Sequence, residues 1–323
     1  MSDLRQKSSR QLEAGTRGPV RQSPGPEWSR RPHGRRGRAG GSSLLLAAAA
    51  LLASAGIGGA AARADDWAPN LTMSATWNDN ATNANLSSDR IRAVQTRADV
   101  LAAQRFIVGR DDTILPAFHA AAEWWPRYQN LFGGAVGARV EWQHKFGVGA
   151  LAPVLSLGGG ADLVAAQEAG RRGTTAVATI ALRKRFNDLW RGSVTHEWSQ
   201  LAARYGVFDR TGNETTIELG RDVTDVARFT VGLSYRSGDV LSYATPPRPD
   251  LLAIARERLD VETFDRPMVA YSVDASTFGA KLGFLRAIDD YTAIVASYEY
   301  RTTEKSPLRY VNHLVSLGVV HQF

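Results

Sequence analysis

The sequence predicts an all-β protein, a transmembrane up-and-down antiparallel β-barrel of about 12 strands. Three observations lead to this prediction. Apolar and polar residues alternate along segments that recur about every 20 residues, the charged residues of these segments fall almost entirely on one face, and the connections are alternately short and long. Because successive side chains of a strand point to opposite faces, each segment has one apolar and one polar wall.

The clearest alternating segment covers residues 132–146, FGGAVGARVEWQHKF. Val140 and Trp142 fall on its apolar face, whereas Arg139 and Glu141 fall on the polar face. Charged side chains along a whole strand face need ion-pair partners or water, so this face does not suit the dry core of a soluble sandwich. The segment fits a barrel strand between lipid and a polar interior.

The same alternation predicts the other strands. In chain order, the predicted strands cover residues 70–78, 99–108, 113–125, 132–146, 150–159, 174–186, 189–199, 214–222, 226–237, 276–287, 292–302 and 310–323. Pro153 has no N–H for a sheet ladder, so it requires a position near a turn or at a bulge. Short connections such as 109–112 alternate with longer ones such as 80–97, which is typical of a barrel whose two ends differ.

The charged face is the predicted lining of the barrel interior. The predicted pore-lining residues are Arg105, His119, Glu123, Arg139, Glu141, Lys145, Arg183, Arg185, Arg191, Glu197, Glu218, Arg228, Arg236, Lys281, Glu299 and Arg301. The basic residues gather toward the short connections, and acidic residues, Asp162 among them, gather toward the long ones. A basic ring at one mouth is expected to concentrate anions, because charge of one sign in a narrow low-dielectric pore focuses the electric field.

The apolar face carries aromatic residues near both ends of the predicted strands. Those near the short connections are Phe106, Phe146, Trp190, Phe229 and Phe323, and those near the long connections are Trp77, Trp124, Phe132, Trp198, Tyr235, Tyr298 and Tyr300. Amphipathic aromatic rings favour the two interfaces of a bilayer. Two aromatic bands therefore indicate a barrel that spans a membrane.

Residues 1–64 form a separate predicted region. They contain 11 of the 39 basic residues but only 3 of the 32 acidic ones, so the positive charge of the chain belongs to this leader and gives no reason to expect a nucleic-acid partner. We expect a disordered basic segment over 1–42, followed by an apolar run and a signal-peptide cleavage site after Ala64. The mature barrel would then cover residues 65–323 and, having no cysteine, would contain no disulfide.

The final strand carries a more specific pattern. Val315, Leu317, Val319, His321 and Phe323 alternate on the apolar face up to the last residue. This pattern resembles the C-terminal signature of bacterial outer-membrane β-barrels of the porin-like kind, although His321 stands where those proteins often have an aromatic or aliphatic residue. The resemblance identifies no single family. It implies an outer-membrane location, pairing of the last strand with the first, and recognition of Phe323 by the barrel-assembly machinery.

The resemblance and the basic ring together suggest a passive diffusion channel, since some twelve-stranded porins pass acidic sugars through channels lined by Arg and Lys. We expect small solutes, with anions favoured, as the cargo. The expected neighbours are outer-membrane lipid and lipopolysaccharide, and homo-oligomerisation is left open. A plugged barrel with a structural or surface role is the alternative, because neighbouring Arg and Glu side chains can also form ladders that fill the lumen.

An outer-membrane lipid hydrolase or deacylase is a further alternative, since His196 and His313 fall on the lipid-facing side near Ser199 and Ser316. Residues three apart in a strand point to opposite faces, which counts against both His/Ser pairs. No histidine spacing suggests a metal site and there is no nucleotide-binding loop, so we expect no cofactor and no enzymatic activity.

The connection at 241–267 is the only stretch with a helical pattern, because Leu251, Leu252, Ala255 and Leu259 fall on one helical face. A lid in the mouth and a solvated surface loop are both compatible with this pattern.

Overall fold

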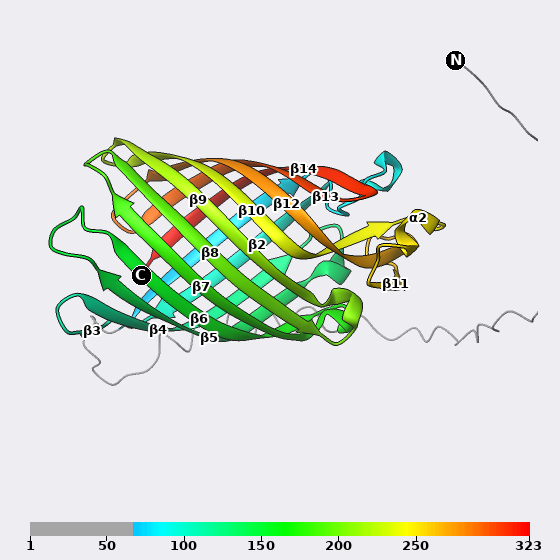
Figure 1. The fold of residues 1–323 in the computed structure, drawn as a ribbon, viewed down its shortest axis with the longest axis horizontal. Helices are drawn as coiled ribbons and strands as arrows, with labels where there is room; N and C mark the ends of the chain where they lie inside the picture. Colours follow the sequence, from blue (N-terminus) through cyan, green and yellow to red (C-terminus); the bar gives the residue numbers. More distant parts are fainter. Residues whose placement is uncertain (1–66) are drawn as a thin grey trace, which may run out of the picture. The chain divides into compact units, whose positions relative to one another are not determined.

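The computed structural model describes residues 67–323. The leader, the predicted signal peptide and its cleavage site after Ala64 lie outside the described residues. The described chain forms a closed, 12-stranded antiparallel β-barrel, which confirms the predicted fold class (Figure 1). The barrel strands are β1 (Ala68–Asn78), β2 (Ala93–Ala103), β4 (Asp112–Trp124), β5 (Gly133–Lys145), β6 (Val154–Ala166), β7 (Gly173–Arg185), β8 (Trp190–Ala203), β9 (Arg210–Thr224), β10 (Ala227–Ala244), β12 (Met268–Ala287), β13 (Thr292–Lys305) and β14 (Leu308–Gln322).

The ring closes between the last and the first strand, as predicted. β14 pairs with β1 from Asn70 opposite Gln322 to Asn78 opposite Leu314. The N–H of Phe323 also donates a hydrogen bond to the carbonyl oxygen of Pro69 at 3.0 Å. Closure gives every barrel strand a partner on both sides, which a sheet exposed to lipid requires.

The second predicted strand is divided in two. β2 and the short β3 (Phe106–Val108) both pair with β4 in one continuous register. Between them, the N–H of Gln104 donates to the carbonyl oxygen of Pro116 at 3.0 Å, but Pro116 has no N–H to return a bond. The proline therefore accounts for the interruption of the ladder.

The outer surface of the barrel is apolar, the reverse of a soluble protein. Phe118, Leu163 and Leu317 expose more than 60% of their surface on outward strand positions. Most of the predicted aromatic residues lie on this surface near the strand ends, but Phe132 is buried. Phe132 follows a 3-10 helix, η2 (Gln129–Leu131), and precedes β5, so its ring is covered rather than exposed as an aromatic band would require.

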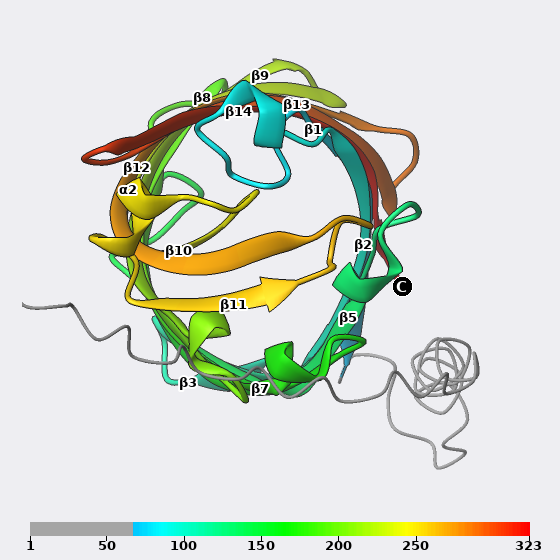
Figure 2. The same ribbon diagram turned by 90° about the vertical axis from the view of Figure 1, so that its right-hand side faces the viewer.

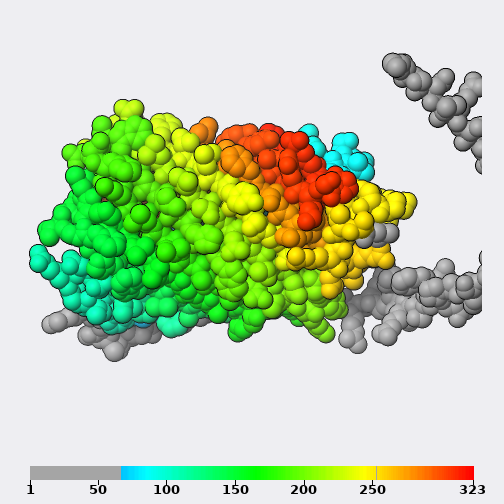
Figure 3. Space-filling model, in the orientation of Figure 1, coloured from blue at the N-terminus to red at the C-terminus, as the bar shows by residue number. Residues whose placement is uncertain are grey.

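The two ends of the barrel differ as expected. Short turns join the strands at one end, whereas the other end carries η1 (Ser87–Asp89), η2, η3 (Ala169–Arg171), η4 (Gly206–Phe208), the helix α2 (Pro249–Leu252) and the strand β11 (Glu257–Val261). Figure 3 shows the loops around 85–90 and 245–260 at the same end of the molecule. Among residues 67–323, no helix is long and apolar enough to cross a membrane.

The predicted helical character of loop 245–267 is mostly wrong. Only Pro249–Leu252 is helical, and Leu259 lies in β11, which pairs with β12 from Val261 opposite Met268 to Glu257 opposite Ser272. β13 pairs with β12 only from Ser276 onward, so this part of β12 would otherwise have a free edge. Pairing of β11 with that edge satisfies backbone groups of β12 that a continued helix would leave without partners.

A hydrophobic core lies across the long-loop end of the barrel. We call it the mouth core, and its buried members are Ala93, Tyr128, Leu131, Val207, Phe208, Tyr243, Val261, Phe264, Met268 and Ala270. They come from β2, from loops on opposite sides of the ring, and from β10, β11 and β12, and Figure 2 shows β11 drawn across the opening. Loop 245–267 is thus a lid over the mouth.

Arg248 ties the lid to loop 79–92. Its guanidinium group lies 3.6 Å from Asp89, donates to Asn85 at 3.1 Å, and forms a two-pronged pair with Asp250 at 2.6 and 2.8 Å. These hydrogen bonds and the positive charge of Arg248 hold the pKa of Asp250 below its usual value. Loop 79–92 is also joined to the end of β10, since the N–H of Tyr243 donates to the carbonyl oxygen of Thr82 at 2.9 Å.

Candidate functional site: the charged lumen

The strand registers place the predicted pore-lining residues on the face opposite to the exposed apolar side chains, except Arg105, which lies between β2 and β3 and is in no strand. The set is Arg105, His119, Glu123, Arg139, Glu141, Lys145, Arg183, Arg185, Arg191, Glu197, Glu218, Arg228, Arg236, Lys281, Glu299 and Arg301. Two further ion-pair clusters on this face include residues that the sequence analysis had not assigned.

The first cluster, which we call the His119 network, crosses the adjacent strands β2, β4, β5 and β6. Arg97 donates two hydrogen bonds to Asp99, each 2.7 Å long. His119 lies between two carboxylates, with Nε2 3.6 Å from Asp99 and Nδ1 3.0 Å from Asp162. Arg139 completes the chain by donating to the other oxygen of Asp162, whose side chain is only 4% exposed.

Two glycines create the space for this network. Gly137 lies between His119 on one neighbouring strand and Asp162 on the other, and because it has no side chain the two can meet above it. A Cβ at Gly137 would lie 2.0 Å from the carbonyl oxygen of Ala161 and 2.3 Å from Asp162 Oδ1. A Cβ at Gly160 would likewise lie 2.3 Å from Cδ of Arg139. The glycines therefore fix which side chains can reach across the wall.

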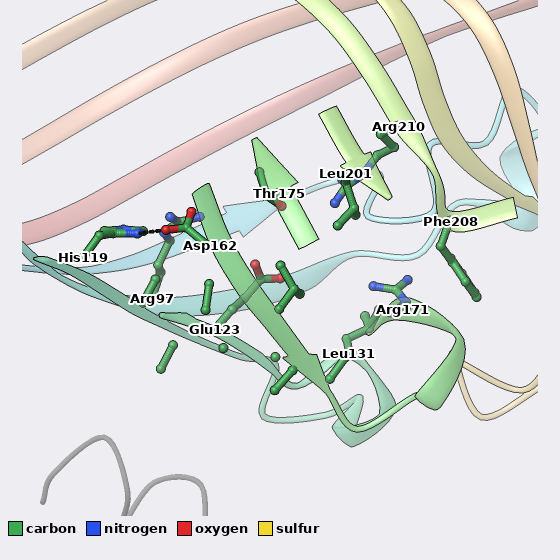
Figure 4. A pocket seen from close by; sticks show the side chains of 18 of the residues that line it. Arg97, His119, Glu123, Leu131, Asp162, Arg171, Thr175, Leu201, Phe208 and Arg210 are labelled. Carbon is green, nitrogen blue, oxygen red and sulfur yellow. Dashed lines mark hydrogen bonds and ion pairs between the residues drawn. The ribbon is translucent and has the colours of Figure 1, made fainter. Parts of the chain in front are cut away.

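A cavity of about 360 Å³ extends from the His119 network toward the underside of the mouth core. Figure 4 shows Arg97, His119 and Asp162 at one end and Leu131 and Phe208, which belong to the mouth core, at the other. The remaining labelled residues are Glu123, Arg171, Thr175, Leu201 and Arg210. The cavity is thus lined by side chains of both signs of charge, and its long-loop end carries Arg171 and Arg210 beside the apolar Leu131 and Phe208.

The second cluster surrounds Asp222 near the short-turn end. Arg228 donates to Asp222 Oδ1 at 2.6 Å, Arg191 pairs with the other oxygen, and Arg185 lies 3.7 Å from it. Gly220 lies between Arg191 and Arg228 and leaves room for both. Asp222, a carboxylate that was not among the predicted lining residues, therefore offsets part of the positive charge of these three arginines.

The other predicted lumen residues differ in whether they have partners. Arg183 lies 3.8 Å from Glu141, and Arg301 donates to Glu299 at 2.5 Å. Within residues 67–323, no ion pair involves the basic residues Arg105, Lys145, Arg236 and Lys281. These four side chains keep their charge available to whatever occupies the lumen.

Neither of the two His/Ser pairs weighed for a hydrolase is brought together. Nδ1 of His196 lies 2.9 Å from the hydroxyl of Thr215, and Nδ1 of His313 lies 2.8 Å from the hydroxyl of Tyr298. Ser316 instead contacts Thr76 inside the barrel. In the described part of the chain, no group of three or more His, Cys, Asp or Glu residues is arranged to hold a metal ion.

Comparison with known proteins gives a likeness in structure only. No protein-family model matches the chain, and no curated protein matches its sequence. Among solved structures, the COG4313 outer membrane channel from Pseudomonas putida F1 is similar with a TM-score of 0.54 at 8% identity, over 80% of this chain and 96% of that one. The chain has the fold of an outer-membrane β-barrel. KdgM porin (TM-score 0.41, 10% identity, 79% and 99% covered) and NanC porin (0.44, 7%, 78% and 100%) are more distant.

Proposed function

We propose that the chain is a passive diffusion channel of the outer membrane for small solutes, with a preference for anions. The observation that carries the proposal is the continuous charged inner wall, which includes four basic residues without an ion-pair partner among residues 67–323: Arg105, Lys145, Arg236 and Lys281. A structural barrel has no need for unpaired charge in its interior, whereas a channel uses it to attract permeant ions.

The position of the basic residues supports the anion preference. Lys145 and Arg105 lie toward the short-turn end, as do the three arginines around Asp222. In barrels of this fold the short turns face the periplasm. Anions that enter the lumen would therefore meet increasing positive potential along the way to the periplasm.

A plugged barrel with a structural or surface role is the second candidate. The mouth core favours it, because buried apolar residues from several loops pack across the long-loop end. In the channel proposal, solutes pass beside the lid or after it moves. We propose no catalytic role, since His196 and His313 are engaged with Thr215 and Tyr298.

Liposome swelling separates the two candidates. Vesicles that contain the full chain are placed in isotonic solutions of a sugar acid or of the neutral sugar of equal size. A channel of the proposed kind gives swelling in both, faster with the sugar acid. A plugged barrel gives none in either, and faster entry of the neutral sugar would contradict the anion preference.

The proposed surroundings follow from the fold. The apolar belt would be covered by membrane lipid, with lipopolysaccharide at the long-loop side, and the C-terminal strand with Phe323 would be the segment that the barrel-assembly machinery recognises. Homo-oligomerisation would require a protein-facing patch on the same outer wall.

A further inference from the structure

A groove of about 740 Å³ lies at the long-loop end and shares no lining residue with the lumen cavity. Its basic lining residues are Arg90 and Arg92 from the end of loop 79–92, Arg127 from the β4–β5 loop, and Arg266 from the lid. Four guanidinium groups from three separate loops thus converge on one groove.

The four arginines are not neutralised by the protein. Within the described residues, none of them forms an ion pair with a carboxylate. Arg266 is held by hydrogen bonds to the carbonyl oxygens of Ser88 and Asp89, at 3.3 and 3.1 Å, and neither acceptor carries a full charge.

Two acidic residues, Asp79 and Asp265, also line the groove. Oδ1 of Asp79 accepts a hydrogen bond from the backbone N–H of His313 at 2.7 Å, so one oxygen of this carboxylate already has a partner outside the groove lining. With four arginines against two carboxylates, the groove retains an excess of positive charge.

From two tryptophans on the outer wall we infer that the groove lies near the level of the lipid headgroups. Trp77 and Trp124, both exposed on the outer wall, flank the start of β2, with Trp77 opposite Val94 and Trp124 opposite Thr96. Arg92 directly precedes β2, two residues before Val94, which places it roughly 6–7 Å further along the chain toward the long-loop end. Interfacial tryptophans mark the edge of the hydrocarbon, and the polar region beyond it is only about 5–7 Å thick on each side.

We propose that this groove binds the phosphate groups of a phosphorylated glycolipid of the outer leaflet. Arg side chains form two-pronged, charge-assisted hydrogen bonds with phosphate oxygens, so a cluster at headgroup depth is suited to a lipid phosphate. Bound lipid would connect loop 79–92, the β4–β5 loop and the lid, and the site is independent of whether the lumen conducts.

The test measures binding of bisphosphorylated lipid A to the full chain in detergent by native mass spectrometry. The variant R90Q/R92Q/R127Q removes three charges whose side chains form no hydrogen bond or ion pair within residues 67–323, although Arg127 lies over the ring of Tyr128 at 5.4 Å. The control is R309Q, which removes one exposed arginine at the start of β14, at the same end of the barrel, where it pairs with Glu304 at 3.0 Å. Heat-modifiable migration on a gel establishes that each barrel is folded.

We expect the triple variant to bind roughly 100-fold more weakly, since each basic residue at an anionic membrane surface contributes about a fivefold factor. The control should change binding less than about threefold. Equal binding by the folded triple variant, or equally tight binding of lipid A without its phosphates, would overturn the proposal. Displacement of the lipid by an equal concentration of free tripolyphosphate would show that a soluble anion is the occupant and would overturn it as well.

Discussion

Replacing Gly137 by alanine should destabilise the barrel through the His119 network. The new Cβ would lie 2.0 Å from the carbonyl oxygen of Ala161 and 2.3 Å from Asp162 Oδ1, and the backbone oxygen has no freedom to move away. Asp162 would have to withdraw from His119 and Arg139, both of which it now contacts. A hydrogen bond between charged groups contributes about 1.5–3 kcal/mol. With discounting for the partly exposed Arg139, we expect a loss of about 2–4 kcal/mol in the free energy of unfolding.

Chemical denaturation of the barrel in lipid vesicles, followed by tryptophan fluorescence, measures this loss. Gly158→Ala is the matched control, because Gly158 also faces inward but its Cβ would have nothing nearer than 3.6 Å. The control should unfold within about 1 kcal/mol of the parent. If the two variants lose equal free energy, the cost comes from glycine replacement in general, and the assigned role of Gly137 is wrong.

Three further predictions concern the channel and its lid. Arg183→Glu together with Arg185→Glu should abolish or reverse the anion preference, as measured by the reversal potential in a salt gradient. Phe264→Ala should raise the open-channel frequency by about 100-fold or more, because loss of a buried Phe costs about 3–5 kcal/mol in the mouth core; unchanged single-channel openings would contradict a gating lid. The pKa of Asp250 is lowered from its usual 3.8. Ionised Asp250 therefore stabilises the closed lid fully above pH 3.8, and this stabilisation is lost as the pH falls through the lowered pKa. Hydrogen exchange of loop 245–267 should therefore accelerate, relative to the intrinsic rate, only below that pH, and an Asp250→Asn variant should lack the step.

The barrel architecture could be predicted because its main determinant is local. The period of two fixes which side chains of a strand share a face, and lipid on one side with water on the other imposes opposite polarity on the two faces. Lys281 and Glu218 could thus be assigned to the interior from the alternation of their own strands.

The His119 network could not be predicted, because it depends on the register between β4 and β6, which are not neighbours. His119 reaches Asp162 only because Gly137 stands between them, and nothing local marks that glycine as different from Gly158. If the strand register is known, a charged residue directly across from a glycine indicates that its side chain can reach over that glycine to the next strand.

The predicted start of β2 was too late in the sequence. As a result, Arg97 was assigned to a loop and its ion pair with Asp99 on the inner wall was missed. The strand begins at Ala93, whose inward side chain belongs to the mouth core, so the polar stretch that follows was taken as loop. The conformation of loop 245–267 was predicted wrongly for a related reason. It is set by pairing with the edge of β12 and by contacts in the mouth core, and neither can be seen in the sequence pattern of the loop itself.

Planar-bilayer conductance of the full chain under a salt gradient tests the central claim most directly. The account predicts stepwise openings whose reversal potential lies toward that of the anion. A membrane-inserted, heat-modifiable barrel that never conducts, in the parent and in Phe264→Ala alike, would contradict the channel and leave the plugged barrel.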